Sequence, residues 1–107
     1  MSNVLYLFDT SGYWIAFKQG KYLFNNKAEW IGWFPKDNIA VDVNGSYLGT
    51  IYKNDRLLFD HTQPYIPYPG YPGYPGYPGY PGYPGFRGYI GYIPSTSDIS
   101  REKLKEY

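Results

Sequence analysis

The sequence has no cysteine and only one histidine among its 107 residues. The lack of cysteine excludes a disulfide framework and a thiolate metal site. His61 has no second histidine or cysteine beside it, so it predicts neither a metal ligand nor a catalytic base. We therefore expect no catalytic residue, no metal and no cofactor, and we do not expect an enzyme.

An excess of charge of either sign is also missing. The chain has 10 Lys and Arg against 9 Asp and Glu, which leaves a net charge of +1. This balance gives no electrostatic basis for binding nucleic acid or an anionic membrane surface. Neither nucleic acid nor a membrane is an expected partner.

Long apolar runs are missing as well. The start, MSNVLYLFDTSG, has no basic segment and its apolar run is interrupted at Asp9, so it does not resemble a signal peptide. No apolar run reaches the roughly 18–20 residues that cross a bilayer. We expect a soluble, cytoplasmic protein, and the length allows one domain.

Aromatic residues, by contrast, are abundant, and the composition changes along the chain. Aromatic residues make up 22% of the sequence, including 15 Tyr, and most of the 13 Gly and 10 Pro follow residue 63. Aromatic residues favour half-buried strands, whereas Pro and Gly disfavour them. The sequence predicts a β-hairpin repeat domain at 1–62 plus 86–94, a Pro/Gly/Tyr low-complexity tract at 63–85, and a polar tail at 95–107.

The first half contains a repeat. Three segments align without gaps: LFDTSGYWIAF (7–17), LFNNKAEWIGW (23–33) and AVDVNGSYLGT (40–50). Each has the pattern of a β-hairpin, with an apolar strand, a turn rich in Asp, Asn and Gly, and a strand carrying an aromatic, an aliphatic and a small residue. Regular alternation places Trp14 and Ala16 on one face and Ile15 and Phe17 on the other. The small residue predicts a close approach where hairpins meet.

One polar slot recurs in every copy. It is occupied by Asp9, Asn25, Asp42 and Asp60. A ring of four such groups would be able to bind a cation. The favoured interpretation is structural, because Asx side chains accept hydrogen bonds from turn amides two residues further on.

A fourth hairpin is less regular. LLFD at 57–60 resembles the start of a repeat, but the aromatic–aliphatic–glycine tripeptide returns only at Tyr89–Gly91. We therefore interpret the tract as an insertion into the turn of the fourth hairpin. The alternative is that YIGY at 89–92 is one more Gly-containing triplet, since Gly88 and Gly91 keep the period of three.

Residues 68–85 are six copies of Tyr-Pro-Gly. Proline excludes a helix and a central strand, and polyproline II accommodates the triplet and aligns its tyrosines in one stripe. A straight rod of this length spans about 56 Å, too long to link two strands of one hairpin. The tract must double back at a glycine, remain disordered, or carry its last strand to a neighbouring subunit. A short collagen-like triple helix is a less favoured alternative.

In the polar tail, Ser97 or Asp98 is a suitable cap for a short helix holding Ile99 and Leu104. Such a helix would be marginal in isolation.

The three repeat units followed by RLLFD and a Pro/Gly-rich tract resemble the bacterial four-fold beta flower proteins. The resemblance covers residues 4–60 well and the tract loosely. It implies an all-β fold in which pseudo-symmetric antiparallel hairpins surround a common axis, with no established activity and no site residues to transfer. Ala28 stands where the family's turn normally has glycine, which predicts a distorted second turn.

These patterns predict a non-enzymatic structural or protein-interaction module that forms homo-oligomers through β edges and the tract. The candidate interaction surface is Tyr68, Tyr71, Tyr74, Tyr77, Tyr80 and Tyr83. The predicted repeat core is Trp14, Trp30, Tyr47 and Tyr89. The alternative is a carbohydrate- or peptide-binding module lined by Trp14, Trp30, Trp33 and Tyr47, although buried tryptophans are the favoured interpretation.

Overall fold

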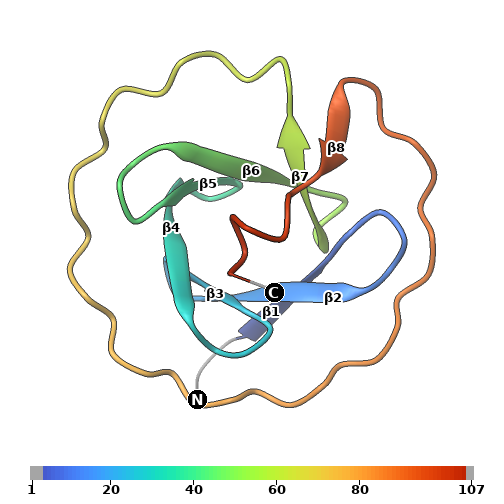
Figure 1. Ribbon diagram of the computed structural model, residues 1–107, viewed down its shortest axis with the longest axis horizontal. Helices are drawn as coiled ribbons and strands as arrows, with labels where there is room; N and C mark the ends of the chain where they lie inside the picture. The colour runs from blue at the N-terminus through green and yellow to red at the C-terminus, as the bar shows by residue number, and fades with distance from the viewer. Residues whose placement is uncertain (1–3, 106–107) are drawn as a thin grey trace.

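The computed structural model describes residues 4–105 and contains strands but no helix among them (Figure 1). The strands are β1 (Val4–Phe8), β2 (Trp14–Gln19), β3 (Tyr22–Asn25), β4 (Trp30–Lys36), β5 (Ile39–Asp42), β6 (Tyr47–Tyr52), β7 (Arg56–Asp60) and β8 (Thr96–Asp98). Each strand pairs with the next in antiparallel fashion, and one parallel bridge joins Phe8 of β1 to Arg56 of β7. This bridge closes a seven-stranded barrel, and β8 is added to β7.

The strands form four hairpins around a common axis, β1–β2, β3–β4, β5–β6 and β7–β8 (Figure 1). The first three hairpins have equivalent registers, because Leu7 lies opposite Ala16, Leu23 opposite Gly32 and Ala40 opposite Gly49. The predicted all-β fold of pseudo-symmetric hairpins is therefore confirmed.

A β-bulge occurs at the same place in each of these three hairpins. The residue after Leu7 pairs with Trp14, so Ile15 is an extra residue in β2. Ile31 and Leu48 hold the same position in β4 and β6. The predicted alternation was therefore wrong: Ile15 and Ala16 both join the central cluster, whereas Trp14 and Phe17 lie in a second cluster. A bulge breaks the two-residue period of a strand and so redirects its side chains.

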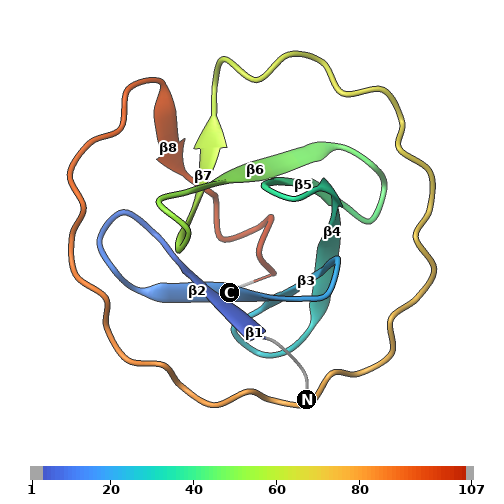
Figure 2. The ribbon, with the colours of Figure 1, turned by 180° about the vertical axis from the view of Figure 1, so that it is seen from behind.

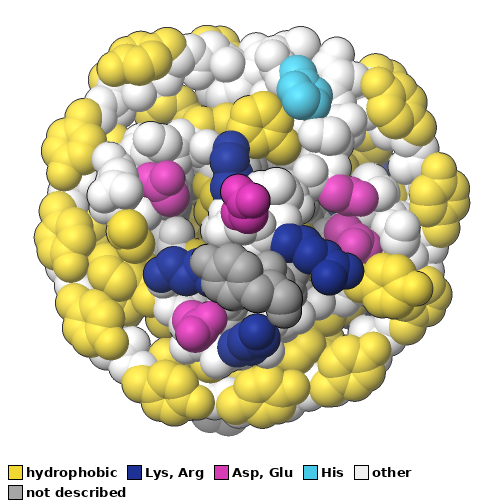
Figure 3. All heavy atoms as spheres, in the orientation of Figure 1, with side chains coloured by type: hydrophobic (Ala, Val, Ile, Leu, Met, Phe, Trp, Pro, Cys, Tyr) yellow, Lys and Arg dark blue, Asp and Glu magenta, His cyan; other side chains and the backbone are white. Residues whose placement is uncertain are grey.

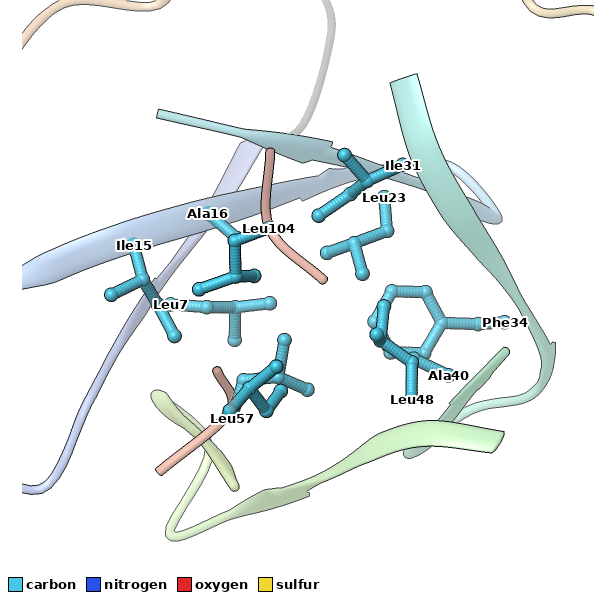
Figure 4. Close-up of a cluster of buried hydrophobic side chains, with 11 residues drawn as sticks. Leu7, Ile15, Ala16, Leu23, Ile31, Phe34, Ala40, Leu48, Leu57 and Leu104 are labelled. Atoms are coloured by element: carbon cyan, nitrogen blue, oxygen red, sulfur yellow. The ribbon is translucent and has the colours of Figure 1, made fainter. Parts of the chain in front are cut away.

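The central core fills the barrel with aliphatic side chains from all four hairpins (Figure 4). It contains Leu7, Ile15, Ala16, Leu23, Ile31, Phe34, Ala40, Leu48, Leu57, Ile99 and Leu104. Leu104 comes from the tail, and its main-chain carbonyl accepts a hydrogen bond from the Asn25 amide at 2.8 Å. The tail thus covers one end of the barrel.

The predicted short helix in the tail is absent from the described residues. Arg101–Lys105 form turns, with Leu104 N donating to the Arg101 carbonyl at 3.1 Å. Ile99 and Leu104, the two apolar residues that the predicted helix would have held, are both buried in the core. Residues 106 and 107, the end of the predicted tail, lie outside the described residues.

The small slot lies where hairpins meet, as predicted. A Cβ on Gly32 would lie 2.1 Å from the Val41 carbonyl oxygen of the next hairpin. A Cβ on Gly49 would lie 3.1 Å from the Leu58 carbonyl oxygen of β7 and 2.7 Å from Ile99. These glycines therefore let adjacent strands approach each other.

The recurring Asx residues act as turn acceptors. In each hairpin the side-chain oxygen accepts main-chain N–H groups at 2.9–3.0 Å. Ala28 does not distort the second turn, because it adopts the left-handed conformation itself, with φ of 63°, and donates to the Asn25 carbonyl as Gly12 does to Asp9. The favoured turn interpretation agrees with these contacts.

The fourth hairpin differs from the prediction in its second strand. Leu58 pairs with Asp98 as Phe8 pairs with Trp14, and Ile99 then enters the central core like Ile15. Asp98 thus occupies the aromatic slot that Tyr89 was predicted to fill. Tyr89 is 71% exposed and outside any strand, so segment 86–94 does not belong to the sheet. The tract lies between β7 and β8, the two strands of this hairpin.

We call the inserted segment, residues 61–95 between β7 and β8, the belt. It encircles the barrel and returns to its starting point, as the two opposite views show (Figures 1 and 2). Its glycines from Gly70 to Gly91 all have φ between 78° and 95°, which departs from straight polyproline II. Glycine takes this φ in type II turns, where proline often precedes it, so each triplet bends the chain.

Candidate interaction surface

The belt is anchored to the barrel by tryptophans of the hairpins. Trp30 lies between Tyr71 and Tyr74, with ring centroids 5.9 and 5.5 Å away. Trp14 lies between Tyr80 and Tyr83 at 5.8 and 6.0 Å. Each indole is itself held in place, since its N–H donates at 2.7 Å to the main-chain carbonyl two residues further on.

Tyrosine hydroxyls of the first strands add a second anchor. Tyr22 donates to the carbonyl of Pro72 at 3.1 Å, and Tyr6 donates to the carbonyl of Pro81 at 2.9 Å. Prolyl residues have no N–H, so the carbonyl is the main-chain group that remains available for binding.

Belt and barrel therefore have matched periods. Tyr6 and Tyr22 are sixteen residues apart in the barrel, and the prolines that they bind are nine residues apart in the belt. Nine residues are three Tyr-Pro-Gly triplets, and they span one hairpin of the ring. The tripeptide repeat is thus matched to the pseudo-fourfold barrel.

The returning part of the belt contacts the turn of hairpin one. Phe86 packs edge-on against Tyr13 with ring centroids 5.4 Å apart. The amides of Arg87 and Ile90 donate to carbonyls of this turn at 2.9 and 3.1 Å. A Cβ on Gly12 would lie 2.3 Å from the nitrogen of Gly88, so the two main chains touch.

Arg56 connects the belt to the barrel seam, where β1 meets β7. Its guanidinium is buried and donates to the carbonyls of Asp9 at 2.9 Å and Gly88 at 2.7 Å. Its Nε lies 3.2 Å from the Asp55 carboxylate. This role could not be predicted from the sequence, because the two carbonyls that Arg56 binds belong to the main chain and are 47 and 32 residues away.

The other face of the belt presents tyrosine rings to solvent. The six predicted surface tyrosines, Tyr68 to Tyr83, are 55–72% exposed. In the space-filling view, hydrophobic side chains line the rim of the molecule (Figure 3). The structure thus displays the predicted interaction residues as a ring at the circumference.

Comparison with known protein families matches residues 1–99 to the family described as 4-fold beta flower protein. The chain belongs to this family. The match extends through the belt and β8, beyond the residues 4–60 on which the resemblance was strongest. No curated protein and no solved structure matches this member of the flower family.

The predicted repeat-core residues of this flower protein divide into three kinds. Trp14 is buried, whereas Trp30 and Tyr47 are half-buried in the equivalent slot, and Tyr89 lies outside it. Trp33, named with them as a candidate sugar-binding residue, is also buried. Tryptophan therefore contributes mainly to packing.

The groups with clearly shifted pKa values lie together between hairpins three and four. Burial, followed by a hydrogen bond to Asp60, raises the pKa of Tyr52 to about 12. Burial also raises the pKa of Tyr47, whose hydroxyl accepts from Asp60 N at 3.0 Å. Hydrogen bonds from the Thr62 and Tyr52 hydroxyls lower the pKa of Asp60. This cluster fixes the point where the belt leaves β7.

The remaining predicted features can be placed briefly. His61 lies 2.9 Å from the Ser97 hydroxyl and edge-on to Phe59. Residues 4–105 contain no group of three or more His, Cys, Asp or Glu side chains arranged to hold a metal ion. Within the same residues, no helix meets the length and hydropathy needed to span a membrane.

Proposed function

We propose that this flower protein is a non-enzymatic interaction module that binds a second copy of itself through the belt tyrosines. The observation that supports this proposal is the ring of exposed tyrosines held at fixed spacing by the barrel. Contiguous exposed apolar patches mark interaction sites, and tyrosine is enriched in interfaces. Because the barrel already holds the belt in place, binding a second copy does not carry the entropic cost of ordering the belt.

Free strand edges offer a second route to the predicted assembly. Within residues 4–105, residues 4–7 of β1 pair only with β2, and β8 pairs only with β7. Both edges are short, which limits their capacity for strand addition. The tyrosine ring is therefore the main proposed surface and the edges are secondary.

Light scattering at several protein concentrations tests this proposal. We expect the molar mass to rise with concentration, and to remain monomeric when Tyr68, Tyr71, Tyr74, Tyr77, Tyr80 and Tyr83 are changed to Ser. The same six residues changed to Phe form the matched control, which keeps the rings and should assemble. A monomeric wild-type chain at every concentration, or assembly of the six-Ser variant, would contradict the proposal.

The carbohydrate-binding alternative is less well supported, because Trp14 and Trp33 are buried and Trp30 is covered by belt tyrosines. A panel of soluble glycans that quenched tryptophan fluorescence would favour it instead. Cytoplasmic location stays a prediction.

A further inference from the structure

Hairpin three lacks the anchor that hairpins one and two share. In those two hairpins an indole fills the space between successive belt tyrosines, with ring centroids 5.5–6.0 Å apart. The equivalent residue of hairpin three is Tyr47, which pairs with Val41 as Trp30 pairs with Phe24.

The ring of Tyr47 is directed elsewhere. It packs on Phe59 with ring centroids 5.1 Å apart, and its hydroxyl lies 2.6 Å from the Thr50 hydroxyl. The same hydroxyl accepts the Asp60 amide. Tyr47 is thus committed to the barrel and to hairpin four, and the belt above it has no indole behind it.

Two hollows flank this part of the belt. One, of about 410 Å³, lies toward the turn at Gly45, and the other, of about 460 Å³, lies toward Ile39. Both are bounded by the same belt residues, which include Gln63, Pro64 and Tyr65. Tyr65 is 87% exposed, more than any of the six tyrosines that follow it. We call this region the hairpin-three slot.

The chemistry of the slot suits a phenol ring. Its walls combine prolines, isoleucines and tyrosine rings with the polar residues Asn44, Ser46 and Gln63, and Lys36 is the charged residue at its border. Gln63 precedes Pro72 by one nine-residue period, and Ile39 takes the place of Tyr22, so no phenol hydroxyl is available there for the Gln63 carbonyl. A tyrosine from outside would supply both the missing ring and the missing donor.

We propose that the hairpin-three slot accepts Tyr65 of a second copy, and that the two copies exchange this side chain around a two-fold axis. Tyr65 stands at the border of the slot and is the most exposed of the belt tyrosines. In an isologous dimer one patch meets its own copy, so a side chain beside a slot can fill the partner's slot reciprocally. This inference rests on the proposed function and narrows it to the part of the belt beside hairpin three.

The dissociation constant of the dimer, measured by sedimentation equilibrium, tests this inference. Tyr65→Ser removes the inserted ring, and Tyr47→Trp supplies an indole that fills the slot from within while leaving every belt tyrosine in place. We expect each change to weaken dimerisation at least tenfold. Two matched controls, Tyr47→Phe and Tyr77→Ser, leave both slot and inserted ring intact and should dimerise within about threefold of wild type.

The outcomes separate this inference from the proposed function. Wild-type affinity in both Tyr47→Trp and Tyr65→Ser would overturn the exchange of Tyr65, even if the six-Ser variant, which retains Tyr65, were monomeric. A monomeric wild-type chain would instead contradict the proposed assembly itself. Denaturation of Tyr47→Trp checks its fold, and Tyr65→Ser, which alters only an exposed belt residue, remains informative if that fold is disturbed.

Discussion

The guanidinium of Arg56 lies where the barrel seam, the turn of hairpin one and the belt meet. Across the seam, one parallel bridge and a 2.8 Å hydrogen bond from Phe8 N to the Asp55 carbonyl join β1 to β7. Hydrogen bonds that involve a charged group contribute about 1.5–3 kcal/mol each to stability. The two carbonyl bonds of Arg56 are therefore a major part of this closure.

Arg56→Met should lower the free energy of unfolding by about 3 kcal/mol, because the two carbonyls lose a charged donor. Chemical denaturation measures this change. Arg87→Met is the control: Arg87 is half exposed and its ion pair with Asp55 is 3.7 Å long, so its loss should cost below about 1 kcal/mol. Equal effects of the two changes would show that Arg56 has no special role at the seam.

Tyr52 makes stability sensitive to alkaline pH. Its pKa is raised from 10.0 to about 12 in the folded protein, so the folded state holds the phenol proton more tightly than the unfolded state does. This contribution is complete below pH 10 and is lost as pH rises toward about 12. Asp60 acts at the opposite end, because its lowered pKa gives a contribution that is lost as pH falls.

Absorbance titration of the phenols between pH 9 and 12 measures this effect. We expect Tyr52 to ionise late in the wild-type protein, and its part of the late absorbance change should be missing in Tyr52→Phe, in which Tyr47 still ionises late. The denaturation midpoint of the variant should also decline less over this range. The same late absorbance change in wild type and Tyr52→Phe would contradict the raised pKa of Tyr52 and the burial and hydrogen bond to which it is assigned.

At the scale of the strand, the repeated bulge explains how so short a repeat builds a barrel. The extra residue turns Ile15, Ile31 and Leu48 into the centre, and a bulge increases strand bending and twist. The adjacent small residue then allows the next hairpin to approach. Each of the first three hairpins therefore has its own bulge, which curves the strand, and its own small residue, which contacts the next hairpin.

Gly32→Ala should be strongly destabilising, because the new Cβ would lie 2.1 Å from the Val41 carbonyl oxygen and force two hairpins apart. We expect a loss of about 3 kcal/mol in the free energy of unfolding, at the upper end of the usual cost of overpacking. In Gly20→Ala the added methyl meets no atom within 4 Å, and positive φ alone should cost about 1 kcal/mol. Similar losses would argue against a close contact at Gly32.

The elements that could be predicted from the sequence are those specified by interactions between residues close together in the chain. Asx and glycine residues specify the turns through short-range hydrogen bonds, so the first three hairpins could be found from their spacing. The bulge could not be predicted, because an alternating pattern assumes that each residue of one strand pairs with one residue of the next. The second strand of hairpin four was missed because Asp98 replaces the aromatic residue, although Ile99 followed by Ser100 keeps the aliphatic–small pair.

At the scale of the whole molecule, the length of the belt determines the path that it can take. A straight polyproline II rod of eighteen residues would span about 56 Å, whereas the longest axis of the protein is 35 Å. We predicted that the tract doubles back, is disordered or docks on a neighbouring subunit. A tract that encircles its own barrel was not among these predictions. Each positive φ at a glycine bends the belt only slightly. That these bends add up to a ring is evident only in the structure, where the belt surrounds the barrel.

Deletion of the triplet Tyr77–Gly79 should break the match between belt and barrel. The belt would then be three residues too short to contact Trp30 and Trp14 together and still reach β8. We expect the amides of Arg87 and Ile90, which bind the turn of hairpin one, to exchange with solvent at least tenfold faster. Tyr77→Ser changes composition but not length, and unchanged exchange in both variants would contradict the matched periods.

The belt is an ordered ring that the barrel holds in place through the tryptophans and tyrosines of its hairpins. The most direct test is the set of ¹⁵N order parameters of glycine amides after glycine-selective labelling, with Gly32 and Gly49 of the strands as internal references. If the belt is ordered, Gly70 to Gly91 should have values of about 0.85, equal to those of the strands. Belt values below about 0.6 would show a mobile loop instead of an ordered ring.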